Sequence, residues 1–174
     1  MALYSASVEY GLHCLLYLAD ASSTAKVSSL DLAEIQGISP SYVAKLFTQL
    51  KNAGLVTALE GAQGGYRLAR RAEDITVLSV IEALEGAKPL FQCREIRRNC
   101  ALFRGSPPTW ATKGLCGIHQ VMLEAETAMK RSLAGHSLAE LAQGVAHKMP
   151  KTFSIEMNAW FENRQASKSR RRAN

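Results

Sequence analysis

Three of the four cysteines of this 174-residue chain lie between residues 93 and 116, and a histidine follows the last of them. Six residues separate Cys93 from Cys100, fifteen separate Cys100 from Cys116, and His119 stands three positions further on. Zinc ribbons and knuckles use tight C-x₂₋₄-C pairs, which this spacing lacks. Three dispersed thiolates with a harder ligand suit an iron–sulfur cluster better, because a long loop can wrap around it. On spacing alone, buried or idle thiols remain the alternative.

The segment VEYGLHC, residues 8–14, contains a second pair of potential ligands. Glu9 and His13 are four residues apart, so they share one face of a helix that is otherwise mostly apolar. Such a pair ordinarily stabilises the surface of a helix by about 0.2–0.5 kcal/mol. The alternative is that both side chains bind a metal, and the spacing leaves both interpretations open. Cys14 lies inside the apolar stripe and is expected to be a small core residue.

The elements that would position these residues begin with a helix over 5–20 and two short helices after it. Ser28 or Ser29 can cap the first short helix, and Gly37 fits the left-handed position that ends it. Ser39 caps the next helix, with Pro40 at its first position, where a missing N–H is no loss. Two short helices joined by a tight turn predict a helix-turn-helix.

A β-hairpin is predicted directly after the helix-turn-helix. Residues 55–59 and 66–68 favour extended structure, and a glycine-rich tip lies between them. A hairpin in this position is a wing, and a further helix follows it from its cap at Thr76 to Gly86. The expected fold class is therefore mainly α with a small β-hairpin wing. It consists of a winged helix-turn-helix and a long dimerisation helix, which is predicted over residues 117–133.

This fold predicts binding to double-stranded DNA, because the second helix of a helix-turn-helix enters the major groove. The first residues of that helix would touch base edges and phosphates, and glycines in the wing would permit close approach to the DNA backbone. The candidate DNA-binding residues are Ser39, Pro40, Ser41, Tyr42, Lys45 and Gln49 in the helix and Gln63, Gly64, Gly65, Tyr66 and Arg67 in the wing. For single residues, the alternative is that the tyrosines only pack and that the lysine is merely solvated.

Helical periodicity is absent from residue 87 to about 115, in a stretch that contains Phe91, Phe103 and Trp110. Disordered segments are poor in aromatic residues, so a functional loop is favoured here. Residues 117–133 then form a long helix with an apolar seam that suits pairing with a partner helix. The expected regions are a DNA-binding domain (1–86), a cluster-binding loop (87–116), a dimerisation helix with a closing helix (117–148) and a basic, disordered tail (149–174).

The chain has 21 basic and 15 acidic residues, a formal net charge of +6 that fits a polyanionic partner but is a weak signal alone. No apolar run approaches the roughly 18 residues that span a bilayer, and the apolar first helix lacks the basic start of a signal peptide. A soluble cytoplasmic protein without membrane contact is therefore expected. The tail RQASKSRRRAN is interpreted as a solvated terminus, with a nucleic-acid arm as the alternative.

The order of these segments resembles the Rrf2 family of bacterial transcription regulators. The resemblance covers residues 1 to about 145 and rests on the first helix, ISPSYVAKLFTQLKNAGLV, the wing GAQGGYRL, the helix ITVLSVIEALEG and the cysteine loop. It implies a homodimer that crosses through the helix 117–133 and binds a dyad-symmetric operator. Many members of the family have an iron–sulfur cluster in the loop before that helix.

Two ligand schemes of the family map onto this chain. IscR-like members use three loop cysteines and a nearby histidine, which here are Cys93, Cys100, Cys116 and His119, although the second gap is longer than in those proteins. RsrR-like members bind a [2Fe–2S] cluster with two loop cysteines of one subunit and a glutamate and a histidine from the first helix of the other. VEYGLHC, FQCREIRR and CGI are similar to that subgroup. This second resemblance implies the ligands Glu9, His13, Cys93 and Cys116, with Cys100 and His119 in reserve.

Together, the residues and the resemblance predict a dimeric DNA-binding regulator, with repression as the expected sign, that senses redox or nitrosative stress or iron status. Within the family, the alternatives are a cluster-free thiol switch that uses Cys93 and Cys100 and a sensor with three cysteine ligands. A cysteine-dependent enzyme is the alternative from another class. No Cys–His pair has a family context for catalysis and no segment resembles a substrate cleft, so the chain is not expected to be an enzyme.

Overall fold

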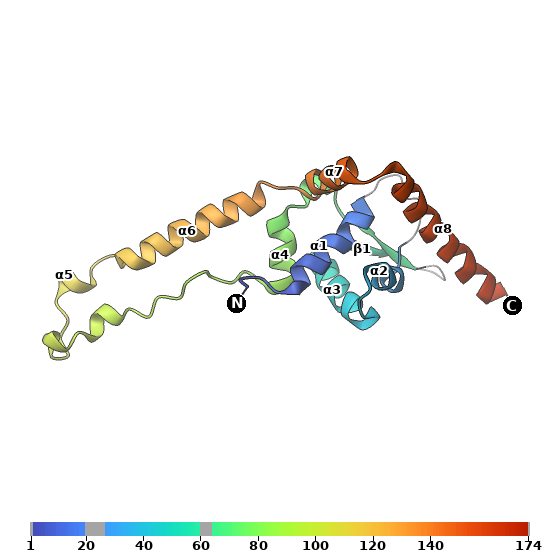
Figure 1. Ribbon diagram of the computed structural model, residues 1–174. Helices are drawn as coiled ribbons and strands as arrows, with labels where there is room; N and C mark the ends of the chain where they lie inside the picture. The colour runs from blue at the N-terminus through green and yellow to red at the C-terminus, as the bar shows by residue number, and fades with distance from the viewer. Residues whose placement is uncertain (1, 20–26, 60–63, 174) are drawn as a thin grey trace. The chain divides into compact units, whose positions relative to one another are not determined.

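The structure is a computed structural model that describes residues 2–19, 27–59 and 64–173 (Figure 1). The chain forms two compact units, Met1–Gly86 with Leu133–Asn174, and Ala87–Ser132. The first unit contains strands β1 (Val56–Leu59) and β2 (Gly65–Leu68) and helices α1 (Ala6–Ala19), α2 (Ser29–Gln36), α3 (Pro40–Asn52), α4 (Val77–Glu85), α7 (Leu138–Lys148) and α8 (Lys151–Ala173).

The helix-turn-helix begins and ends at the capping residues that the sequence predicts. The Ser28 hydroxyl accepts the Asp31 N–H and the Asp31 carboxylate accepts the Ser28 N–H, which completes a capping box on α2. Gly37 ends α2 at a φ of 65°, in the left-handed region. The Ser39 hydroxyl caps α3 by accepting a backbone N–H, with Pro40 first in the helix. The predicted helix-turn-helix is therefore confirmed.

The predicted wing is present as the antiparallel pair β1–β2, in which Val56 lies opposite Leu68. The Tyr66 ring packs on Phe47 of α3 with the ring centroids 4.6 Å apart. The Tyr66 N–H also donates to the carbonyl oxygen of Val27, just ahead of α2. These contacts attach the wing to both helices of the helix-turn-helix, and the predicted fold class is confirmed.

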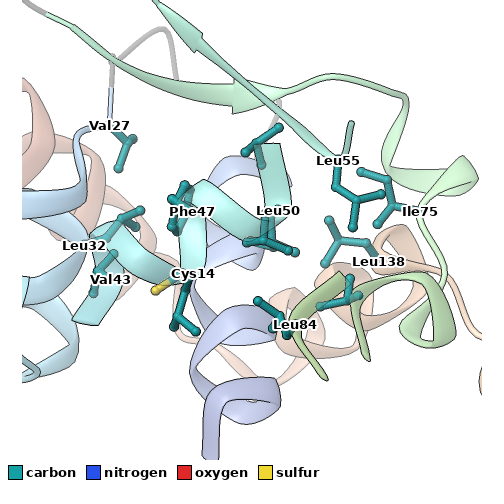
Figure 2. Close-up of a cluster of buried hydrophobic side chains, with 14 of the residues drawn as sticks. Cys14, Val27, Leu32, Val43, Phe47, Leu50, Leu55, Ile75, Leu84 and Leu138 are labelled. Carbon is teal, nitrogen blue, oxygen red and sulfur yellow. The ribbon is translucent and has the colours of Figure 1, made fainter. Parts of the chain in front are cut away.

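One hydrophobic core connects the helices and the wing of the first unit (Figure 2). Phe47 and Leu50 of α3 meet Cys14 of α1, Leu55 beside the wing and Leu138 of α7 in this cluster. Full burial of a large aliphatic or aromatic side chain contributes about 1.5–3 kcal/mol, so the core is the main source of stability. Burial also raises the pKa of the Cys14 thiol to about 12, which keeps it protonated and confirms its structural role.

The expectation of a disordered tail over residues 149–174 is wrong, because α8 extends over Lys151–Ala173. Met157 and Phe161 of this helix are buried, and the Phe161 ring meets Tyr17 of α1 edge-on with centroids 5.8 Å apart. The basic composition after residue 162 suggested a solvated terminus, but the apolar residues before it dock the helix on the first unit.

The second unit contains three short helical turns, η2 (Ile96–Asn99), η3 (Ala101–Phe103) and α5 (Thr109–Thr112), and most of the long helix α6 (Gly117–Ala134). The helix predicted over 117–133 is thus confirmed. None of the α6 residues is buried, and Ile118, Val121 and Leu123 are exposed. Pairing of α6 with a partner helix stays a prediction. Across the described parts of the chain, no helix has the length and apolar character needed to cross a membrane.

Candidate functional site

The recognition helix α3 has one buried apolar face and one exposed polar face. Ser41, Lys45 and Thr48 are exposed, and their spacing places them on the same side of the helix. Sequence reasoning missed Thr48, although its position three residues after Lys45 and seven after Ser41 indicates the shared face. This polar stripe is the part of α3 that is available to a ligand.

The start of α3 is suited to an anion. The Ser39 and Ser41 hydroxyl oxygens are 2.8 Å apart, and both side chains are exposed, as is Pro40. The first N–H groups of a helix carry a partial positive charge that favours a phosphate. Tyr42, in contrast, is half-buried with its ring edge-on to Tyr10 at a centroid distance of 5.9 Å, so packing occupies part of its surface.

Gln49 points inward and is not a suitable base contact. Its side-chain amide donates to the carbonyl oxygen of Leu84 in α4 at 3.2 Å, and the residue is half-buried. The last carbonyls of a helix have no intrahelical partner, and Gln49 supplies one for α4. The structure therefore assigns Gln49 to the contact between α3 and α4, unlike the predicted role at DNA.

The wing presents two of its five predicted contact residues plainly to solvent. Gly64 and Arg67 are exposed, whereas Gly65 is buried and Tyr66 is half-buried against Phe47. Gln63 lies outside the described residues. Gly64 and Arg67 are therefore the wing residues that the structure leaves accessible.

Arg97 connects two distant segments of the second unit. Its guanidinium donates to the Glu95 carboxylate at 2.9 Å. It also donates to the carbonyl oxygens of Thr112 at 3.4 Å and Gly114 at 2.6 Å. One planar cation thus joins the chain after Cys93 to the chain before Cys116, through the several donors that a guanidinium holds in one plane.

Cys93 and Cys116 are half-buried and share the electrostatic environment of Arg97. The pKa of Arg97 is raised, first by its hydrogen bond with Glu95 and also by Coulombic interaction with Cys116 and Cys93. The Cys93 sulfur accepts a hydrogen bond from the Glu95 N–H at 3.5 Å. The Cys93 thiol in turn donates to the Glu95 carboxylate at 3.6 Å.

The other predicted ligands lie in different surroundings. Cys100 is exposed, and His119 is half-buried with its ring 6.1 Å from that of Phe91, centroid to centroid. Glu9 and His13 are exposed on α1 in the first unit. His13 also lines a largely apolar cavity of about 400 Å³ between α1, α7 and α8.

A [2Fe–2S] cluster takes four protein ligands. Within the described residues, no group of three or more histidine, cysteine or acidic side chains is placed to hold a metal. The second unit supplies two thiols beside one guanidinium, and the first supplies a carboxylate and an imidazole. These residues fit the group only if the ligand set is completed from a second source.

Comparison with known proteins agrees with this arrangement of elements. The Rrf2 family model, described as an iron-dependent transcriptional regulator, matches residues 4–144. Protein rrf2 of Nitratidesulfovibrio vulgaris is 39% identical over 132 residues, 76% of this chain and 81% of that protein. CymR, the global cysteine regulator of B. subtilis, has a TM-score of 0.63 at 25% identity and covers 82% of this chain and 98% of its own. T. potens IscR has a TM-score of 0.63 at 26% identity, over 88% of this chain and 96% of its own.

The similarity is to transcriptional regulators, which agrees with the expectation of a regulator and not an enzyme. The match spans the winged helix-turn-helix, the cysteine loop and α6. The chain belongs to the Rrf2 family of transcriptional regulators.

Proposed function

We propose that this regulator binds dyad-symmetric DNA as a homodimer and senses redox or nitrosative stress or iron status through a [2Fe–2S] cluster. The proposed ligands are Cys93 and Cys116 of one subunit and Glu9 and His13 of the partner subunit. The observation that carries the proposal is the Arg97 guanidinium, which binds Glu95 and the Gly114 carbonyl oxygen and so joins the segment after Cys93 to the segment before Cys116. Glu9 and His13, which are exposed on α1, would complete the set.

The DNA part of the proposal rests on the exposed residues of α3 and the wing. Ser39, Ser41 and the start of α3 would bind phosphate, while Lys45 and Thr48 reach further along the groove. In a dimer, two such helices enter major grooves one helical turn apart, roughly 34–36 Å. The uncovered apolar side chains of α6 support a dimer, since an exposed apolar seam favours a partner helix.

The chain's own residues set the chemistry of the proposed site. When bound, a [2Fe–2S] cluster supplies a one-electron centre whose potential rises when histidine replaces thiolate, as in Rieske centres. Arg97 would offset the negative charge of two cysteine ligands, and the Glu95 N–H donates to Cys93. A histidine released from a metal takes up a proton near neutral pH, so loss of His13 as a ligand would couple to protonation.

A route from this site to the DNA-binding surface is present in the first unit. Tyr10, next to Glu9 in α1, packs edge-on against Tyr42 near the start of α3. A change in the position of α1 would therefore shift the N-terminal end of α3, which is the end proposed to bind phosphate. Small displacements of α3 are enough to change the affinity for DNA, because the two α3 helices of a dimer must meet two half-sites at a fixed separation.

The test is the visible spectrum of anaerobically purified protein in single-residue variants. Cys93→Ala and Cys116→Ala are expected to lose the charge-transfer absorption, and Glu9→Ala and His13→Ala to shift it, while Cys100→Ala retains it. The ligand assignment is wrong if Cys100→Ala abolishes the absorption and both α1 variants keep the wild-type spectrum. Mixing the α1 and cysteine variants adds a direct check, because heterodimers would regain one intact site.

A cluster-free thiol switch is the second candidate, and the exposure of Cys100 favours it. The similarity of the chain to CymR, a cysteine regulator, also favours this candidate. This candidate predicts colourless protein whose DNA affinity changes on oxidation. The change would be absent in both Cys93→Ala and Cys100→Ala, whereas the cluster proposal predicts that Cys100→Ala behaves as wild type.

A further inference from the structure

The helix α8 lies beyond the part of the chain that matches the family, which ends at residue 144. After Glu162 it contains Arg164, Lys168 and the run Arg170–Arg172 without an acidic residue. A basic helix docked on a DNA-binding domain requires an explanation that the family match does not provide.

The first half of α8 is fixed to the winged helix-turn-helix by apolar contacts. Phe161 and Met157 are buried, and the Trp160 ring lies under the Arg164 guanidinium, 5.1 Å from its centroid. Phe161 also meets Tyr17 of α1. The direction of the helix is therefore determined by contacts within one compact unit.

The second half of α8 is paired with α2 in a definite order. Arg164 pairs with Glu34 and, at 3.5 Å, with Asp31. Lys168, one turn later, pairs with Asp31 at 2.5 Å and donates to the Ser28 hydroxyl at 2.9 Å. As residue numbers rise along α8 they fall along α2, so the two helices run antiparallel and α8 advances toward the N-terminus of α2.

This direction carries the residues after Lys168 past Ser28, the N-cap of α2. Each further helical residue adds about 1.5 Å, so Arg172 extends roughly 6 Å beyond Lys168 along the axis. The same end of α2 is bonded to the wing, because the Val27 carbonyl accepts the Tyr66 N–H at 2.8 Å. The basic end of α8 is therefore on the wing side of the helix-turn-helix.

The charges of α8 fall into two groups with different surroundings. Arg164 and Lys168 are neutralised by Asp31 and Glu34, and neither is more than one-third exposed. Arg170 is exposed and makes no ion pair with the residues that the structure describes. The first helix of a helix-turn-helix crosses the DNA backbone, and a wing lies along it.

We propose that the basic last turn of α8, which begins at the exposed Arg170, is an additional contact to the phosphate backbone of duplex DNA, held in place by the pairing of Arg164 and Lys168 with α2. This surface rests on the proposed DNA-binding function and extends it beyond α3 and the wing. The contact reads no sequence, because it meets phosphates and not base edges. It would strengthen binding to operator and to other duplexes alike.

The test compares two variants that each lose two positive charges. Arg170→Gln with Arg171→Gln removes part of the proposed contact, and Lys148→Gln with Lys151→Gln removes the same charge at the opposite end of α8. Affinity is measured from 50 to 200 mM NaCl on a duplex that the wild-type protein selects from a random-sequence library, and on an unselected duplex of equal length. Each lost phosphate contact lowers the slope of log affinity against log salt by about 0.9.

The arginine variant is expected to bind both duplexes more weakly than wild type at 50 mM NaCl and to show a slope smaller by up to about 1.8. The ratio of wild-type to variant affinity should therefore fall by up to about 12-fold between 50 and 200 mM NaCl. The lysine variant should keep the wild-type slope. Equal slopes in the two variants overturn the proposal. This is also the result expected if the arginines bind an acidic protein and not DNA. If the wild-type protein selects no sequence at all, the proposed function fails instead, and the two failures are thus distinguishable.

Discussion

Arg97 donates a hydrogen bond to the carbonyl oxygen of Gly114 at 2.6 Å and so fixes the segment after Cys93 to the segment before Cys116. Arg97 lies in the turn η2, and none of η2, η3 and α5 contributes a buried side chain. With so little apolar burial, polar contacts of this kind decide the conformation of the loop. The geometry of a ligand site built there would therefore depend on Arg97 as well as on the cysteines.

Replacement of Arg97 is expected to weaken the site without removing a ligand. Arg97→Gln should lower iron content and visible absorbance per subunit, since loss of an outer-shell partner typically weakens metal affinity about 10–100-fold. Arg97→Lys should rescue little, because lysine retains the charge but not the planar set of donors. Arg98→Gln is the control, since Arg98 is largely exposed and only approaches Glu95, at 3.8 Å.

A readout without the cluster separates this role from chemistry at the metal. In apo protein that carries Cys100→Ser, Arg97→Gln should slow the crosslinking of Cys93 to Cys116 by a short bifunctional thiol reagent. Cys14 does not interfere, because it is fully buried. Crosslinking at the wild-type rate would show that Arg97 does not hold the two segments together.

Asp31 is expected to be a major contributor to the stability of the first unit. Its carboxylate is 1% exposed and accepts hydrogen bonds from Lys168 and from the N–H and hydroxyl of Ser28. Asp31→Asn should lower the free energy of unfolding by about 1.5–3 kcal/mol, the range for hydrogen bonds to a charged group. Glu34→Gln is the matched control, because that side chain is half exposed and should cost about 0–1 kcal/mol in urea denaturation.

The same residue predicts how stability depends on pH. Burial would raise the pKa of Asp31, but the hydrogen bonds and the charge of Lys168, with the hydrogen bonds of Ser28, outweigh it and lower the pKa below 3.8. The folded state thus binds this proton less readily than the unfolded state. The stabilisation is complete above about pH 4 and is lost as the pH falls through the lowered pKa. The difference in unfolding free energy between wild type and Asp31→Asn should therefore shrink on acidification, and a constant difference would contradict the assignment.

Local signals predicted the helix-turn-helix well because they involve neighbours in the chain. Ser28, Gly37 and Ser39 each satisfy backbone groups within a few residues, so their types alone mark where α2 and α3 begin and end. The wing was predictable for the same reason, because its two strands and its tip are also neighbours in the chain. In contrast, Arg97 meets carbonyl groups 15 and 17 residues away, and no residue type marks a carbonyl as an acceptor.

The α8 helix depends even more on contacts that a single sequence cannot predict. Its basic end resembles a disordered terminus by composition, and its order depends on Asp31, which is 137 residues from Lys168. Gln49 is a similar case, since its amide is turned inward by a carbonyl of α4. Pairings across such separations are decided by tertiary packing, which a single sequence does not display.

Two glycines give predictions of opposite sign. Gly37 and Gly144 both have open space where a Cβ would be, but only Gly37 has a left-handed backbone, with a φ of 65°. Gly37→Ala should destabilise the protein by about 1–2 kcal/mol, the cost of that conformation for an L-residue. Gly144→Ala, inside α7, should stabilise it by about 0.5–1 kcal/mol. Thermal or urea unfolding of both variants checks this, and equal effects would contradict the left-handed turn.

The orientations of Thr48 and Gln49 predict different consequences for DNA recognition. Thr48→Ala should change the base preference at one position of each half-site, because loss of a base contact costs about 1–3 kcal/mol of discrimination. Gln49→Ala should leave the selected sequence unchanged and instead cost about 0.5–1.5 kcal/mol of stability, since the Leu84 carbonyl loses its donor. Selection from a random-sequence library, together with urea denaturation, measures both effects. A changed preference in Gln49→Ala with an unchanged one in Thr48→Ala would mean that the α3 face at DNA is rotated from the exposed stripe of Ser41, Lys45 and Thr48.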